Sequence, residues 1–412
     1  MSSFQVQQVS IIGAGLAGLT LALALHQQAI PVTVYEARTE PLNIGGAVML
    51  SPNALKILDA LGLYGTIKSK GFSFDTLEYR NLAGDIIDTQ EFGSEVKYGY
   101  RGLRIYRHVL ISELVSALQK QKVEVVYGKK FSHVTGESSD TTTFAFQDGT
   151  TVTTSLLVGA DGIHSTVRKH MYPDLQTKFI GMAGITAAVP ASQVQLPEGY
   201  HLPVTVMSPQ GAFVMAQQQV DGSEIFFGKQ MRVTPGDKPD WDRDFVADKD
   251  SALEFLQQNN DHFPEFVKNA TAHIDKVTIN KWPFFVVPKL DRWASELRRV
   301  VIVGDAAHAI PPSAGQGINQ AFEDVYMLAL VLGQRQKIRS FELALSFWQE
   351  YRQTRVDKIL VLNQQIDARR MPSKDTVVGS DSSFKREPFD LSWLYQPDFK
   401  QDVQEWVASN SV

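Results

Sequence analysis

The 412-residue sequence contains no cysteine. This absence excludes disulfides, zinc sites built on thiolates, a thiol nucleophile and a cysteinyl bond to a cofactor. A large excess of one charge is also missing, because 40 basic and 45 acidic residues leave a net charge of −5. We therefore expect no nucleic acid partner and no attraction to an anionic membrane.

Hydrophobic runs long enough for a membrane are scarce too. The best candidate, Ile11 to Leu25, falls short of the ~20 apolar residues of a membrane-spanning helix. No basic segment precedes it and glycines interrupt it, which argues against a secretion signal. We expect a cytoplasmic protein without stable membrane insertion, long enough for two or three domains. The sequence assigns no metal ligands and no oligomeric state.

The N-terminal residues carry a nucleotide-binding pattern. Val9 to Ile12 predicts a strand, Gly13, Gly15 and Gly18 follow at the spacing of a dinucleotide-binding turn, and Leu16 to Leu25 predicts a helix. The first glycine allows a sharp turn, the second lets the backbone approach a pyrophosphate, and the third lets helix and strand pack closely. The phosphates would meet free N–H groups and the positive end of the helix dipole. The alternative is a helix start with small residues for packing.

An acid follows at the expected distance from this turn. The next apolar run, Val32 to Tyr35, ends in Glu36, about 20 residues on, where dinucleotide folds place the carboxylate that binds a ribose diol. Because Glu36 would repel a 2′-phosphate, the site fits the adenosine half of FAD or NAD better than NADP. We assign Leu16, Ala17, Ala37 and Arg38 to the edge of the same site.

The next segment offers a loop, a helix and a hairpin. Gly45 and Gly46 either lie against a flat cofactor ring or link to the helix that Ser51 caps and Pro52 begins. Residues 72 to 90 then predict a β-hairpin, because short alternating runs are broken by turn residues.

Two arginines precede a helix further along the chain. Apolar residues repeat at helical spacing from Ile111 to Leu118, so Arg104 and Arg107 lie just before or at the start of this helix. An arginine at a helix N-terminus opposes the dipole, which favours an anionic partner. A surface ion pair is the alternative.

A second ligand-binding signal follows a predicted hairpin. Val123 to Tyr127 and Thr141 to Phe146 predict strands, and the second enters a hairpin turn at Gln147 to Thr150. A buried strand from Leu156 then leads into Asp161 and Gly162. An acid at the carboxyl end of a strand in an α/β sheet lies where ligands bind. A short helix comes next, with Ser165 and Arg168.

The chain changes character between residues 174 and 282. Short apolar runs separated by turn residues predict an antiparallel sheet, and the charged stretch Asp240 to Ala272 is expected to be helical. We expect a second domain here. Its aromatic side chains either line a pocket or fill the core, and for each one singly the core is favoured.

The third signal begins at a buried strand, Val300 to Val303, which ends in Gly304 and Asp305. A loop with two prolines and two glycines follows, and then a long helix from Ile318 to Leu332. Asp305 suits a polyol hydroxyl, and the helix N-terminus offers N–H groups to a developing anion. His308 is either catalytic or structural, and the structural interpretation is favoured.

The C-terminal tail has two parts. Residues Arg369 to Phe389 are polar and predict an exposed linker. The aromatic stretch behind it is expected to dock onto the body of the protein through Trp393, Leu394, Tyr395 and Phe399.

The three separated motifs occur in the order of one known family. The sequence resembles the single-component FAD-dependent aromatic hydroxylases, the group A flavoprotein monooxygenases that include salicylate and p-hydroxybenzoate hydroxylases. GAGLAG with Glu36, VGADGIHSTVR and VGDAAHAIPPSAGQGINQAFED are similar to its FAD motifs, Arg107 to its helix arginine, and WLYQPD to a C-terminal element of salicylate-hydroxylase-like members. The resemblance implies an α/β fold: a Rossmann-type FAD-binding domain with an antiparallel β-sheet substrate domain and C-terminal helices.

The resemblance also implies roles for single residues. Glu36 would bind the adenosine ribose, Arg107 and Asp161 would lie along the FAD and its pyrophosphate, and Asp305 would bind the ribityl chain. Without cysteine, and with no histidine placed by a motif against the ring, we expect FAD to be held non-covalently. The positioning of the flavin for catalysis is assigned to Pro312, Gly315 and Gly317. The other expected FAD contacts are Gly46, Gly162, Gly304, Gln316, Ile318 and Asn319.

The implied chemistry is a monooxygenation. NAD(P)H, a transient co-substrate because a second fingerprint is missing, would reduce FAD, and O₂ would add to give a C4a-hydroperoxide. Its terminal oxygen would pass to an electron-rich carbon of an aromatic or polycyclic small molecule in a dry pocket. The sequence shows no assignable pair of residues for a substrate carboxylate. Epoxidation, dearomatising hydroxylation and inactivation of a polycyclic drug are alternatives, and a non-catalytic nucleotide-binding protein is a remote one.

We divide the chain on this basis. The FAD-binding domain is expected to take residues 1–71, 101–174 and 286–368, the last with a long helix. The substrate domain is expected to take a hairpin at 72–100 and the body at 175–285, and residues 369–412 form the linker and docking tail.

Overall fold

The predicted first strand, β1 (Val9–Ile12), lies at the centre of a parallel sheet with strand order β18-β12-β1-β2-β8. The computed structural model describes residues 6–41, 46–209, 211–236, 241–370 and 389–410. The strands β2 (Val32–Tyr35) and β12 (Leu156–Gly159) flank β1 on opposite sides. The strand order reverses between β1 and β12, and at such a point the carboxyl ends of the strands are where α/β folds bind ligands. The outer strands are β8 (Glu124–Val126) and β18 (Val300–Ile302).

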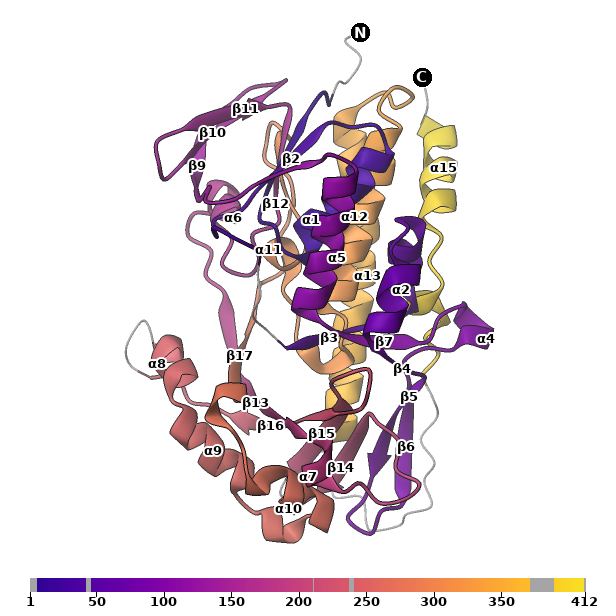
Figure 1. The fold of residues 1–412 in the computed structure, drawn as a ribbon. Coiled ribbons are helices and arrows are strands. Elements are labelled where there is room, and N and C mark those ends of the chain that lie inside the picture. Colours follow the sequence, from indigo (N-terminus) through magenta and orange to yellow (C-terminus); the bar gives the residue numbers. More distant parts are fainter. Residues whose placement is uncertain (1–5, 42–45, 210, 237–240, 371–388, 411–412) are drawn as a thin grey trace.

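Helices cover this sheet, and Figure 1 shows α1 (Leu16–Gln27), α5 (Arg107–Lys120), α12 (Gly317–Gly333) and α13 (Phe341–Arg370) side by side. The first helix is apolar all round, and each residue from Gly18 to Leu25 is buried. Such a helix needs partners on every side, which the sheet, α5 and α12 provide. The predicted strands and helices of the three motifs are therefore confirmed. The long helix α13 was not singled out from the sequence, because its many charged residues hide the apolar pattern.

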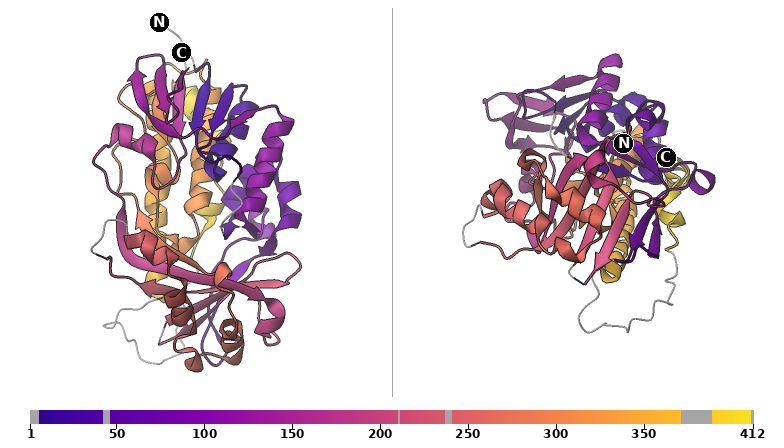
Figure 2. Two further views of the ribbon diagram at one scale, coloured as in Figure 1. Left: turned by 60° about the vertical axis from the view of Figure 1, so that its left-hand side comes forward. Right: turned by 60° about the horizontal axis from the view of Figure 1, so that its bottom comes forward.

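A second sheet of seven strands lies across the end of the helical layer (Figure 2). Its order is β17-β13-β16-β15-β14-β5-β6, which confirms the antiparallel sheet expected between residues 174 and 282. The long strand β13 (Lys178–Pro190) pairs with β16 (Glu224–Arg232) and β17 (Asn280–Val286). The predicted charged helical stretch contains α8 (Trp241–Ala247), α9 (Lys249–Gln257) and α10 (Glu265–Ala272), while Asp240 lies outside the described residues.

The hairpin expected at residues 72 to 90 is present but begins later. The strands β5 (Thr76–Arg80) and β6 (Ile86–Glu91) pair antiparallel and extend the seven-stranded sheet through β14 (Val204–Ser208). Residues 72–74 instead form β4 (Phe72–Phe74), which joins a separate small sheet. Alternation of polar and apolar residues predicts a strand, but it does not determine with which neighbouring strand that strand pairs.

The small sheet has the order β3-β7-β4 and contains two strands that the sequence analysis missed. These are β3 (Ala47–Leu50) and β7 (Gly102–Tyr106), which pair antiparallel. Leu50, Leu103 and Ile105 are buried in the core around the parallel sheet. The alternate residues of β7 therefore face the opposite way, toward the seven-stranded sheet.

Side chains on the two faces of the seven-stranded sheet also differ in their surroundings. Phe213 on β15 (Gly211–Gln217) and Phe227 on β16 are fully buried beneath α9 and α10, whereas Phe226 points to the other face and is half-buried. The core interpretation therefore holds for Phe213 and Phe227, whereas Phe226 lies outside this core.

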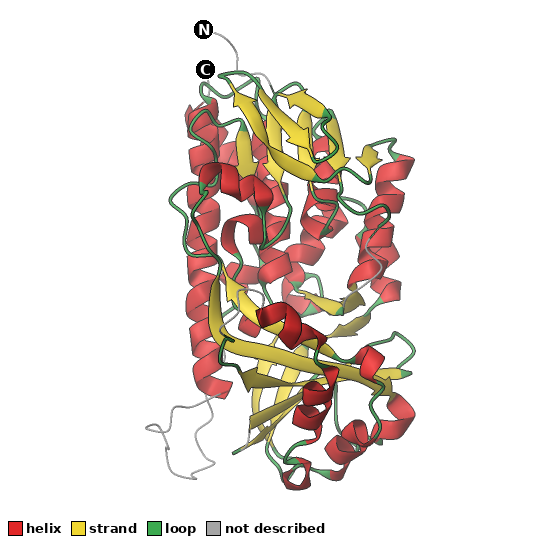
Figure 3. Ribbon diagram, turned by 90° about the vertical axis from the view of Figure 1, so that its left-hand side faces the viewer, coloured by secondary structure: helices red, strands yellow, loops and turns green. Residues whose placement is uncertain are grey.

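The tail docks as predicted. Helices α14 (Ser392–Tyr395) and α15 (Phe399–Asn410) pack on the body, where Leu394, Tyr395 and Phe399 are buried and Trp393 is partly buried. The expected linker Arg369 to Phe389 lies almost entirely outside the described residues. Figure 3 shows α13 running along the side of the molecule to the seven-stranded sheet. Among the helices of the described part, none has the length and apolar composition to cross a membrane.

The remaining elements are a small ribbon of strands and several short helices. A three-stranded ribbon of β9 (Phe131–Glu137), β10 (Thr142–Phe146) and β11 (Thr151–Thr154) confirms the hairpin expected around residues 147 to 150. Short helices fill the connections: α2 (Pro52–Ala60), α3 (Tyr64–Ile67), α4 (Glu95–Tyr98), α6 (Thr166–Met171), α7 (Ala191–Val194) and α11 (Asp305–His308).

Candidate functional site

The loops at the carboxyl edge of the parallel sheet bring the three sequence motifs together. A Cβ atom added to Gly13 would lie 2.6 Å from the carbonyl oxygen of Ala160, so the first motif touches the second. Gly304 of the third motif lies close to Ala17 of the first, 3.8 Å from an added Cβ to the Ala17 Cβ. Motifs separated by about 150 residues in the sequence therefore form one site.

The three fingerprint glycines have different environments. Gly13 has φ +104°, and a Cβ on Gly18 would lie 2.0 Å from the carbonyl oxygen of Gly13, so both positions require glycine for the turn and the close packing. A Cβ on Gly15, in contrast, would meet no protein atom within 4 Å. The roles predicted for the first and third glycines are confirmed. The space in front of Gly15 fits a pyrophosphate at the start of α1.

Glu36 holds the fingerprint turn as well as facing the site. It is 7% exposed, its Oε2 accepts a hydrogen bond from the Ala14 N–H at 2.8 Å, and its Oε1 accepts one from the Arg38 N–H at 2.9 Å. Each carboxylate oxygen can accept more than one hydrogen bond, so a ribose diol can still be bound. The Arg38 and Ala37 side chains are exposed at the border of the site, whereas Leu16 is buried in the core.

The carboxylate of Asp161 in the second motif has hydrogen-bond partners at one of its two oxygens. Its Oδ2 accepts hydrogen bonds from the backbone N–H groups of Thr166 at 2.7 Å and Val167 at 3.1 Å, which caps α6. Its Oδ1 is buried and has no hydrogen-bond partner in the described part of the chain. Burial raises the pKa of Asp161, although hydrogen bonds from Ser165 and the backbone oppose the shift. A buried acceptor without a partner fits a ligand donor.

Arg168 ties the second motif to the third. Its Nη1 donates to the carbonyl oxygen of Ala306 at 2.9 Å, and its Nη2 donates to that of Ile163 at 2.6 Å. Ser165 caps the same short helix by accepting a hydrogen bond from the Arg168 N–H at 2.8 Å. These two residues therefore fix the relative positions of the loops.

Asp305 and Arg107 face one another across the site. Desolvation by the surrounding protein raises the pKa of Asp305 although solvent reaches its side chain, and His308 and Arg107 oppose the shift. Arg107 is the first residue of α5, is exposed, and forms no ion pair within the described ranges. Its backbone N–H donates to the carbonyl oxygen of Gly46 at 3.2 Å, which brings Gly46 to the same place, while Gly45 lies outside the described residues. Of the two alternatives for Arg107, an anionic ligand fits better than a surface ion pair.

The loop from Pro312 to Asn319 presents backbone rather than side chains. The Gln316 Nε2 donates to the Ser51 Oγ at 3.0 Å, and the Asn319 Oδ1 accepts from the Ser51 N–H at 3.0 Å. Both side chains are buried and hold β3, so only their backbone groups remain for a ligand. Gly315 has φ +64°, and a Cβ on Gly317 would meet no protein atom within 4 Å. Gly162 and Gly317 therefore both border open space, while Ile318 is packed against the core.

One local expectation is corrected here. Helix α2 begins after Ser51, as predicted, but the Ser51 hydroxyl does not cap it. It donates instead to the Asn53 Oδ1 at 2.5 Å and accepts from Gln316. Tertiary hydrogen bonds have taken the place of the local cap.

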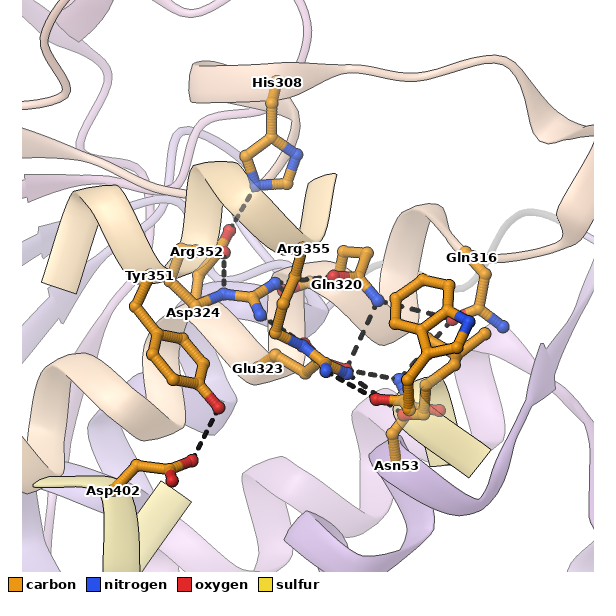
Figure 4. A network of polar contacts seen from close by, with 12 residues as sticks. Asn53, His308, Gln316, Gln320, Glu323, Asp324, Tyr351, Arg352, Arg355 and Asp402 are labelled. Carbon is orange, nitrogen blue, oxygen red and sulfur yellow. Dashed lines mark hydrogen bonds and ion pairs between the residues drawn. The ribbon is translucent and has the colours of Figure 1, made fainter. Parts of the chain in front are cut away.

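A buried network of charges supports the third motif from behind, and Figure 4 shows its members pointing toward one another. Glu323 and Asp324 of α12 are fully buried and pair with Arg352 and Arg355 of α13. Burial alone would raise the pKa of both acids, but the arginines, together with His308 at Asp324, outweigh it and lower both values. We call these four residues, together with His308, the α12–α13 network. The signal in the sequence is the pair of acids inside an otherwise apolar helix.

His308 belongs to this network. Its Nε2 lies 2.5 Å from the Asp324 Oδ2, the ring is 6% exposed, and it packs against Trp293 at 4.9 Å between ring centres. The same Asp324 oxygen accepts a hydrogen bond from the Gly304 N–H at 2.9 Å. This geometry favours the structural interpretation of His308. The described residues contain no group of three or more acidic or imidazole side chains that could hold a metal ion.

Known proteins resemble the chain over most of its length. Residues 6–360 match the family model described as FAD binding domain. The 3-amino-4-hydroxybenzoate 2-monooxygenase of Streptomyces cremeus is 31% identical over 331 residues, which cover 80% of this chain and 79% of that protein. A salicylate hydroxylase in a substrate complex shares the fold with a TM-score of 0.76 at 21% identity, covering 97% of both chains. The HpxO protein of Klebsiella pneumoniae, complexed with FAD and uric acid, gives a TM-score of 0.76 at 23% identity over 91% of this chain and 92% of that one.

Proposed function

This chain belongs to the family of group A FAD-dependent monooxygenases, and from this premise we propose that it inserts one oxygen atom of O₂ into an aromatic or polycyclic small molecule at the expense of NAD(P)H. One observation carries the proposal. The free Oδ1 of Asp161, the exposed Arg107 and Asp305 converge at the open edge of the parallel sheet beside Gly15 and Gly317. A protein that only senses nucleotides would not need the second sheet that faces this edge.

The residues present fit FAD. We assign Glu36 to the adenosine ribose, Gly15 and the N-terminus of α1 to the pyrophosphate, and Asp305 to the ribityl hydroxyls. Arg107 and Asp161 are assigned to the path of the cofactor between these ends. The loop backbone from Gly315 to Asn319 is assigned to the isoalloxazine ring, together with Pro312 and Gly46.

The protein's own part in the reaction is positioning. FAD, when bound, supplies the redox chemistry, namely reduction by NAD(P)H and activation of O₂ by the route that the family resemblance implies. The N–H groups at the start of α12 stabilise negative charge on the bound ring, since the helix dipole is positive there. The loop excludes water from the reacting atoms, and no side chain between Asp305 and Asn319 acts as an obligatory acid or base.

Two measurements test this function. Purified protein should be yellow and should release its flavin into the supernatant on acid precipitation, because FAD is held non-covalently. Phenols, heteroaromatics and polyketides should then be screened for stimulated NAD(P)H oxidation with a product heavier by one oxygen. Epoxidation, dearomatising hydroxylation and drug inactivation are distinguished by the structure of that product. Flavin retained in the pellet would contradict non-covalent binding, and the absence of any oxygenated product would contradict the proposed reaction.

A further inference from the structure

Among the residues that the structure describes, Arg104 is a buried cation without an acidic partner. Its side chain lies on β7 and is 5% exposed. Its Nη2 donates to the amide oxygen of Gln218 at 2.6 Å, and its guanidinium carbon lies 4.5 Å from the centre of the Phe226 ring. Its Nε is buried and has no hydrogen-bond partner in the described part of the chain.

The surrounding groups leave the positive charge of Arg104 in place. Burial lowers its pKa to about 10, a shift that Tyr106 opposes, so the guanidinium is still protonated at neutral pH. Glu224 is the nearby acid, but it accepts the hydrogen bond of the Tyr106 hydroxyl instead of pairing with Arg104. A buried charge without a counterion is unfavourable in a protein, which requires a reason for its presence.

The register places Arg104 beside the proposed flavin site. It lies directly opposite Met49 on β3 and Phe72 on β4, so these three side chains share the face that points toward the seven-stranded sheet. The carbonyl oxygen of Met49 accepts a hydrogen bond from Asn319 at 3.1 Å, in the loop assigned to the flavin ring. Arg104 thus lies one strand away from the loop assigned to the flavin ring, which would supply the oxygen atom.

Small side chains surround Phe226, the residue on the facing sheet that Arg104 contacts. Phe226 is paired with Ala188 on one side and Ala216 on the other, and the next pairs along this face consist of Thr186, Gly228 and Val214. All of these neighbours are small, in contrast to the phenylalanines on the opposite face of the same strands. Small neighbours around the half-buried Phe226 ring are what a planar ligand would need on this face.

We propose that Arg104 binds the carboxylate of an aromatic acid, with Phe226 along the ring and Gln218 orienting the guanidinium, so that the preferred substrates are aromatic carboxylic acids. This assignment rests on the proposed monooxygenase function. The planar fork of arginine matches a carboxylate with two parallel hydrogen bonds, and the free Nε belongs to one such pair. The structure thereby supplies a carboxylate site that the sequence could not assign, since Arg104 and Gln218 are 114 residues apart.

Binding can be tested with benzoate and benzamide, two ligands of nearly equal shape that differ in charge. Both are titrated into the FAD-loaded wild-type protein and into Arg104→Met and Arg104→Lys variants, with the flavin absorbance as readout. Wild-type protein should prefer benzoate by about tenfold or more, Arg104→Met should lose this preference, and Arg104→Lys should keep part of it. The matched control is Arg101→Met, which removes a partly exposed arginine paired with Asp75 at 2.9 Å just before the same strand. Its preference should equal that of the wild type.

The outcomes separate this proposal from the proposed reaction. No preference for benzoate in the wild type, or a preference that survives in Arg104→Met, overturns the carboxylate site. The titration needs no turnover, so a preference that depends on Arg104 stands even if no substrate stimulates NAD(P)H oxidation, an outcome that would contradict only the reaction. Because Arg104→Met leaves no acidic side chain without a partner, the melting temperature of this variant without ligand should equal or exceed that of the wild type. If this variant does not fold, Arg104→Gln takes its place in the titration.

Discussion

Two regions of this molecule bury charged side chains in opposite ways. In the α12–α13 network, each of the buried acids Glu323 and Asp324 meets at least one arginine, and Arg352 contacts both. At the edge of the parallel sheet the Asp161 Oδ1, and beside it the Arg104 Nε, are buried without a hydrogen-bond partner in the described part of the chain. A matched buried charge needs nothing further, whereas an unmatched one needs a ligand to offset its desolvation. The presence or absence of a charged partner therefore distinguishes the residues that support the site from those that bind a ligand.

The two regions are joined at the third motif. Asp324 holds the backbone of Gly304 and the ring of His308, while the next residue after Gly304, Asp305, turns to the open edge. Arg355 carries the same network to the tail by donating to the carbonyl oxygens of Trp393 at 2.8 Å and Leu394 at 3.0 Å. The α12–α13 network thus fixes the position of the residues at the open edge of the parallel sheet.

We expect the largest effect on stability from the removal of Arg352. Replacement by methionine removes one charged partner from each of two fully buried carboxylates, so we expect the free energy of unfolding to fall by about 3–5 kcal/mol. Denaturation in urea measures this loss. The matched control is Lys358→Met, an exposed position on the same helix, which should change stability by less than about 0.5 kcal/mol. Equal stability of Arg352→Met and the wild type would show that matched charges do not support the third motif.

A smaller effect is expected at the open edge, on cofactor affinity. Glu36→Ala and Asp305→Ala should each weaken FAD binding by about 1–3 kcal/mol, because a ligand hydroxyl loses its acceptor. Glu36→Ala also leaves the N–H groups of Ala14 and Arg38 without partners, so this variant should lose some stability as well. Flavin fluorescence titrated with apoprotein gives both affinities, and the exposed Glu40→Ala serves as control. Unchanged affinity in both variants would remove these residues from the site.

The smallest effect on oxygenation is expected at His308. Because His308 faces Asp324 in the closed region, His308→Asn in protein that still binds FAD should keep the rate of oxygenation within about tenfold, roughly 1.4 kcal/mol of barrier. A positioned general base is worth about 10²–10⁴-fold, so a catalytic role would be unmistakable. Normal flavin reduction with abolished hydroxylation would make His308 a chemical group after all.

Gly317→Val provides the contrast to His308→Asn. Its side chain would enter open space instead of protein, so folding should survive while the flavin is displaced. Pro312→Gly should loosen the same loop. In both variants NAD(P)H oxidation should yield more H₂O₂ and less oxygenated product, and tight coupling in both would contradict the positioning role of the loop.

The sequence by itself determined the FAD motifs, the elements around them and the class of enzyme. Local spacing is enough for this, because a strand, a glycine turn and a helix form from neighbouring residues, and the expected strand, turn and helix at residues 9 to 27 agree with the structure almost residue by residue. The same holds for β12 before Asp161 and β18 before Asp305. Family resemblance then connected these three local patterns.

Only the tertiary structure decided which charged residues are matched. Arg104 and Arg352 look alike in the sequence, yet one meets a neutral amide and the other two carboxylates, from partners 114 residues away in the first case and 28 and 29 in the second. The strands β3 and β7 were likewise missed, because their pairing depends on segments about 50 residues apart. Pairing between distant residues is set by packing and not by local pattern, and this pairing is what distinguishes the support of the site from the site itself.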